Sequence, residues 1–62
     1  MNLEVLMTKK DWTGLIDITV RIDGGKEYTF TLPSQYDLEY FEKMRKRTPG
    51  AALNYLKRVQ VK

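Results

Sequence analysis

The segment Leu15–Leu32, LIDITVRIDGGKEYTFTL, decides the fold of this chain. Apolar and polar residues alternate in its first half, and the second half repeats the alternation. A period of two is typical of a β-strand with one buried and one solvated face. The turn Asp23–Gly25 separates the halves, and its glycines adopt positive φ without a Cβ penalty. The segment therefore predicts a β-hairpin with strands over 14–23 and 26–32.

The start of the chain predicts a third strand, over 2–8, in which apolar and polar residues again alternate. A connection rich in polar and turn residues joins this strand to the hairpin. The side chains expected to face the core from the three strands are Leu3, Val5, Met7, Ile16, Ile18, Val20, Ile22, Tyr28, Phe30 and Leu32.

Two helices follow the hairpin. Pro33 stops the strand, and Ser34 is a helix N-cap residue with an acid three positions later. The first helix is predicted over 34–47, with an apolar stripe of Leu38, Phe41, Met44 and, more loosely, Tyr40. Thr48 is expected to cap a second helix over 49–58, which Pro49 can begin because its missing amide would be unpaired there. The fold class predicted is α+β: an antiparallel sheet of about three strands with two helices on one face.

Length and composition indicate one small domain, residues 1–62. The chain has no cysteine, so its core must form without disulfides or thiolate metal sites. No apolar run approaches the roughly 20 residues that span a bilayer. We therefore expect a cytoplasmic protein without a membrane partner.

Charge is distributed unevenly along the chain. Residues 1–42 contain eight acids and four bases, whereas residues 43–62 contain seven bases and no acid. Such asymmetry points to an anionic partner, nucleic acid first among them. Part of the cluster has a structural explanation, because bases near a helix C-terminus suit the macrodipole and Glu39–Lys43 and Glu42–Lys46 are spaced for ion pairs.

Residue types argue against catalysis. Histidine and cysteine are both absent, which removes the common general base and the common nucleophile schemes. Gly24-Gly25 is too short for a phosphate-binding loop and precedes a strand. We predict a non-catalytic protein that uses no cofactor and no metal.

Basic residues combined with aromatic residues are the remaining functional pattern, because single-stranded nucleic acid binds positive grooves that offer stacking rings. The residues predicted to form this site are Arg45, Lys46, Arg47, Lys57 and Arg58, with Trp12 or Tyr55 as the stacking ring. The alternative interpretation of the bases is a solvated face that keeps a small protein in solution. Trp12 likewise has two interpretations: a ring lying over the edge of the core, or an exposed stacking or docking side chain.

Several short motifs within residues 18–58 resemble a known family. They are Tyr28-Thr29-Phe30, Leu32-Pro33, and Thr48-Pro49-Gly50 with Asn54 and Leu56. They are similar to the Tyr-x-Tyr strand, the proline before a helix and the Ser-x-Gly motif of the KTSC domain family, whose members also occur at the C-terminus of some lysyl-tRNA synthetases. Phe30 and Thr48 depart from that pattern. The resemblance implies a small domain of unsettled function, with RNA as the suspected ligand.

The leading functional prediction is a binding module for nucleic acid, with RNA favoured over DNA by the resemblance alone. The alternative is a protein-interaction module or homodimer, in which a partner chain covers the sheet edge or its second face. A dimer predicts a mass that depends on concentration, whereas a nucleic-acid module predicts one contiguous positive face.

Overall fold

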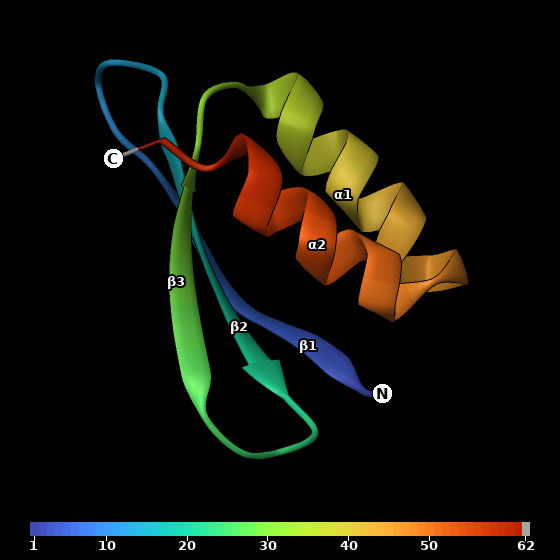
Figure 1. Cartoon of the computed structure of the whole chain (residues 1–62). Coiled ribbons are helices and arrows are strands. Elements are labelled where there is room, and N and C mark those ends of the chain that lie inside the picture. Colours follow the sequence, from blue (N-terminus) through green and yellow to red (C-terminus); the bar gives the residue numbers. More distant parts are fainter. Residues whose placement is uncertain (62) are drawn as a thin grey trace.

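A computed structural model describes residues 1–61 and confirms the α+β class, with elements in the order β-β-β-α-α (Figure 1). The elements are β1 (Leu3–Lys10), β2 (Ile16–Ile22), β3 (Glu27–Leu32), α1 (Gln35–Arg47) and α2 (Pro49–Val59). The strands form an antiparallel sheet in the order β1-β2-β3, and both helices lie on one face of it. Among residues 1–61, no helix is long and apolar enough to cross a membrane.

The turn between β2 and β3 forms where the glycines predict it. The Gly25 amide donates to the Ile22 carbonyl across 2.9 Å, and the two residues between them have positive φ, 52° at Asp23 and 71° at Gly24. Two successive residues with positive φ are the pattern of a type I′ turn, whose twist matches that of the strands it connects. The predicted hairpin is therefore confirmed, and Asp23 and Gly24, not Gly25, are the residues with positive φ.

A β-bulge divides β1. Its register against β2 shifts between Val5 and Met7, so that Val5 lies opposite Val20 and Met7 lies opposite Thr19. One extra residue moves every following side chain to the other face of a sheet. Met7 is accordingly 59% exposed, and the prediction that it faces the core together with Leu3 and Val5 was wrong.

The core lies between the helices and the covered face of the sheet. Its most central side chains, Ile18, Val20 and Phe41 among them, have no exposed surface. Tyr28 lies opposite the buried Val20 and so faces the covered side of the sheet as predicted, but it is 44% exposed and does not belong to the buried core. It stands near the turn end of β3, beside Leu53 and Lys57, where helix α2 covers the sheet only partly. Among residues 1–61 the buried residues are Leu3, Ile16, Ile18, Val20, Phe30, Leu32, Phe41, Ala52, Leu53 and Leu56.

The helices begin as their sequences predict, with one exception. The Ser34 hydroxyl accepts a hydrogen bond from the Asp37 amide at 3.4 Å, which confirms the N-cap of α1. Thr48 ends α1 and begins α2 through its backbone: its amide donates to Met44 O, and its carbonyl accepts from the Ala52 amide. The Thr48 side chain makes no capping hydrogen bond, contrary to prediction.

Candidate nucleic-acid interface

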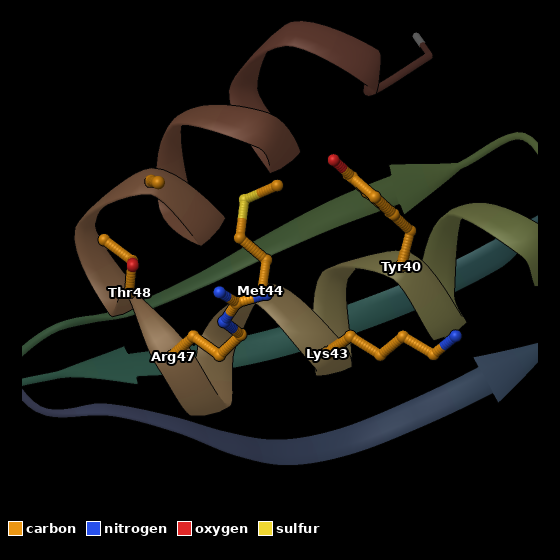
Figure 2. A pocket seen from close by; sticks show the side chains of 6 residues that line it. Tyr40, Lys43, Met44, Arg47 and Thr48 are labelled. Carbon is orange, nitrogen blue, oxygen red and sulfur yellow. The ribbon is translucent and has the colours of Figure 1, made fainter.

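A shallow groove runs between α1 and α2 on the side away from the sheet, and we call it the interhelix groove. It consists of two adjoining depressions that share Tyr40, Met44 and Ala51. Figure 2 shows Tyr40 and Met44 projecting from α1 to the same side, with Met44 directed toward α2. The full lining is Tyr40, Lys43, Met44, Arg47, Thr48, Ala51, Asn54, Tyr55 and Arg58.

Helical spacing explains why these side chains meet. On α1 the residues Tyr36, Tyr40, Lys43 and Arg47 follow one another at intervals of four, three and four, which places them along one face. On α2 the lining residues recur at intervals of three, one and three. Because Thr48 alone separates the helices, the two faces lie side by side.

Three tyrosines form a connected aromatic cluster at one end of the groove. The rings of Tyr36 and Tyr40 are stacked, with centroids 6.4 Å apart and planes inclined by 14°. The ring of Tyr55 meets that of Tyr40 at 4.8 Å and at 59°. Tyr36 is 71% exposed and Tyr40 is 42% exposed, so solvent reaches both stacked rings.

Tyr55 anchors this cluster. Its hydroxyl donates a hydrogen bond to Asp37 Oδ1 at 2.7 Å, and Asp37 Oδ2 accepts a second bond from the Ser34 hydroxyl. Burial, together with this hydrogen bond, raises the pKa of Tyr55 to about 12. The tyrosine is thus a neutral donor at physiological pH, and it fixes the ring against which Tyr40 packs.

The charge of the groove is positive. Lys43, Arg47 and Arg58 line it, and none of the acidic side chains of residues 1–61 does. The two ion pairs found among residues 1–61, Arg21–Glu27 and Glu42–Arg45, involve none of these three cations. An anion in the groove would therefore meet three cations that form no ion pair with a carboxylate of residues 1–61.

The structure gathers some of the predicted site residues in the groove and places others elsewhere. Arg47, Arg58 and Tyr55 line it, whereas Lys46 is exposed on α1 outside the lining. Lys57 lines a separate depression with Tyr28, between α2 and β3.

Arg45 has a structural role. Its Nε donates to Glu42 Oε1 at 2.9 Å, and its Nη1 donates to the Leu3 carbonyl at 3.2 Å, linking α1 to β1. The expected i,i+4 pair of Glu42 with Lys46 is replaced by this i,i+3 pair. We therefore exclude Arg45 from the candidate interface.

Trp12 occupies the tip of the turn between β1 and β2 and is 95% exposed, which corrects the interpretation that its ring lies over the core. Asp11 organises this turn: its Oδ1 accepts from the Thr13 amide at 2.8 Å and from the Leu15 amide at 3.1 Å. Hydrogen bonds from Thr13 hold the pKa of the Asp11 carboxyl below its ordinary value. The ring is thus presented by a well-bonded turn, but outside the interhelix groove.

Sequence reasoning missed Tyr40, Lys43 and Met44 as groove residues, and it missed Tyr36, whose ring stacks on that of Tyr40. Tyr40 and Met44 were assigned to the apolar stripe, and Lys43 to an ion pair with Glu39. The available signal was the spacing of Tyr36, Tyr40, Lys43 and Arg47, which repeats along one face of a helix and contains no acid.

Comparisons with protein-family models, curated proteins and solved structures found no match to this chain. Within residues 1–61, no group of three or more acidic side chains is arranged to hold a metal ion.

Proposed function

We propose that the interhelix groove binds single-stranded nucleic acid. The observation that carries the proposal is that Tyr40, on which the ring of Tyr36 stacks, lines the groove together with three cations that form no ion pair with a carboxylate of residues 1–61. In this proposal Lys43, Arg47 and Arg58 neutralise phosphates, and bases stack on the exposed tyrosine faces. The resemblance to the KTSC family supports RNA as the preferred ligand.

Known energetics define what such binding requires. Base stacking on an aromatic side chain contributes about 1–3 kcal/mol per base and depends little on base identity. Each neutralised phosphate of a single strand contributes about −0.7 to the slope of log K against log salt concentration. A groove with three cations and two accessible rings predicts weak, salt-sensitive binding with little sequence preference.

The test measures that slope directly. Fluorescently labelled single-stranded RNA and DNA are titrated with protein at several salt concentrations. Replacing Lys43, Arg47 and Arg58 together by Gln should flatten the slope by about two. The matched control replaces Lys9, Lys10 and Lys26, which lie outside the groove, and should change the slope much less.

Stacking is tested separately from charge. Tyr40→Leu removes the central ring without changing the net charge, so affinity should fall by a similar factor at every salt concentration, roughly 5–150-fold. The absence of binding at tens of micromolar protein in low salt would overturn the proposal. A slope that the triple Gln variant leaves unchanged would also overturn it.

A further inference from the structure

The open edge of β1 carries a pattern that is complementary to itself. β1 is a terminal strand of the sheet, so one row of its backbone groups has no neighbouring strand (Figure 1). Leu6, at the bulge, is 39% exposed and Met7 is 59% exposed, so apolar surface lies at the middle of this edge. Edge strands of this kind pair readily with another chain unless their sequence prevents it.

The hydrogen bonds at the two ends of β1 identify which residues face the open edge. The Asp23 amide donates to the Asn2 carbonyl, and the Asn2 amide donates to Asp23 Oδ1. At the other end the Asp11 amide donates to Leu15 O. The backbone groups of Asn2 and Asp11 therefore point toward β2. Along a strand, the backbone amide and carbonyl of successive residues point alternately to one side and the other. The bulge inserts one extra residue into this alternation. The groups that face the open edge therefore belong to Leu3, Val5, Thr8 and Lys10. In agreement, the Leu3 carbonyl accepts its bond from Arg45 on α1.

Side-chain direction follows from the same register. Glu4 lies opposite Arg21 and Lys9 lies opposite Asp17, and Arg21 and Asp17 are separated by four residues on the regular strand β2. Glu4 and Lys9 therefore point to the same face, the one not covered by the helices. Without the bulge, their separation of five residues would place them on opposite faces.

We propose that two copies of this chain associate through β1, antiparallel, to form a continuous six-stranded sheet. The register places Val5 opposite Thr8 of the second copy, and Glu4 opposite Lys9 of the second copy. Val5 and Thr8 both face the open edge, so each such pair exchanges two backbone hydrogen bonds. Glu4 and Lys9 share a face, so each copy gains an opposite-charge pair across the dimer. In the same register Leu6 lies opposite Met7 of the second copy, and the two such pairs flank the two-fold axis.

Other registers do not bring opposite charges together on one face of the sheet. A shift by one residue places Glu4 opposite Lys10, whose side chain points to the other face of the sheet. Parallel pairing in register places each charge opposite its own copy, which is destabilising. The charges thus favour one partner, a second copy, in one register.

The first experiment measures mass by sedimentation equilibrium from micromolar to millimolar concentration. The mass should rise from the 7.3 kDa of one chain toward twice that value. Thr8→Pro removes an edge-facing amide without removing a β1–β2 hydrogen bond, so it should weaken association by at least about tenfold. Thr8→Val keeps the amide and should associate as the parent chain does. A mass of one chain throughout the range would overturn the proposal.

The second experiment tests the register and does not depend on how Thr8→Pro folds. Residues opposite each other without mutual hydrogen bonds have Cα atoms about 4.5 Å apart, which a disulfide can bridge. Because the chain has no cysteine, Glu4→Cys and Lys9→Cys each introduce a single thiol. An equal mixture of the two variants, oxidised slowly, should yield mainly the mixed disulfide. A statistical mixture of the three possible disulfides would overturn the register.

Discussion

Tyr55 and Asp37 join the two helices: the Tyr55 hydroxyl, from the middle of α2, donates to Asp37 Oδ1 in the first turn of α1 across 2.7 Å. Asp37 also accepts a bond from the Ser34 hydroxyl, the N-cap of the same helix. One carboxylate therefore connects the start of α1, the packing of α2 and the tyrosine cluster of the groove.

Replacement of Tyr55 by Phe should lower the free energy of unfolding by about 1.5–3 kcal/mol, the range expected when a hydrogen bond to a charged group is lost. The phenyl ring still packs against Tyr40, so the difference isolates the hydroxyl group. Urea denaturation followed by circular dichroism measures it. Equal stability of the two proteins would show that the Tyr55–Asp37 bond contributes nothing.

The same residue predicts a loss of stability in alkali. Burial and the bond to Asp37 raise the pKa of Tyr55 to about 12 from its ordinary value of 10.0. Since the pKa is higher in the folded chain, the folded state binds more protons between these values, and stability falls as pH rises. The contribution is complete below pH 10 and is lost toward pH 12. Melting temperatures of the parent chain and Tyr55→Phe should therefore converge across this window.

Arg45 and Arg47 should differ in what they affect. Arg45→Gln removes the bonds to Glu42 and to the Leu3 carbonyl and should cost about 1 kcal/mol of stability, with little change in the salt dependence of oligonucleotide binding. Arg47→Gln should change stability by less than about 0.5 kcal/mol and should reduce the salt slope. Denaturation and binding titrations of the two variants provide the comparison. A larger loss of stability in Arg47→Gln, or a larger loss of salt slope in Arg45→Gln, would contradict the assignment of Arg45 to the fold and Arg47 to the groove.

Two glycines offer a matched pair. Gly24 has φ of 71° in the turn between β2 and β3, so Gly24→Ala should destabilise the chain by roughly 1–2 kcal/mol, the cost of a left-handed conformation for a residue with a Cβ. Gly50 lies in the first turn of α2 with open space around its missing Cβ, and Gly50→Ala should stabilise by up to about 1 kcal/mol. Thermal denaturation distinguishes the signs, and two shifts of the same sign would contradict the account.

Trp12 contributes exposed surface and little packing. Because its side chain is 95% exposed, Trp12→Ala should change the free energy of unfolding by less than about 0.5 kcal/mol. Its fluorescence in the folded chain should resemble that of a solvated indole and should change little on unfolding. A marked blue shift in the folded state, or a large loss of stability in Trp12→Ala, would show that the ring is covered.

Most of the fold was predictable because local patterns carry it. The alternation on both sides of Asp23–Gly25 specifies the hairpin, and the cap at Ser34 with the break at Thr48-Pro49 specifies two helices. The prediction that failed concerns the register of β1 against β2. No glycine in the sequence indicates the bulge between Val5 and Met7, so the alternation of apolar and polar residues predicted Met7 to lie in the core.

The candidate site was predictable only in part, because net charge does not reveal the direction of a side chain. Local sequence patterns were enough to predict an amphipathic hairpin, two helices separated by one residue, and a C-terminal region without acids. The tertiary structure alone decided that Arg45 serves Glu42 and the Leu3 carbonyl while Arg47 and Arg58 border the groove. The reason is geometric: residues two positions apart on a helix face about 200° apart. Which of them remains free for a ligand depends on the strand or helix that packs against each face.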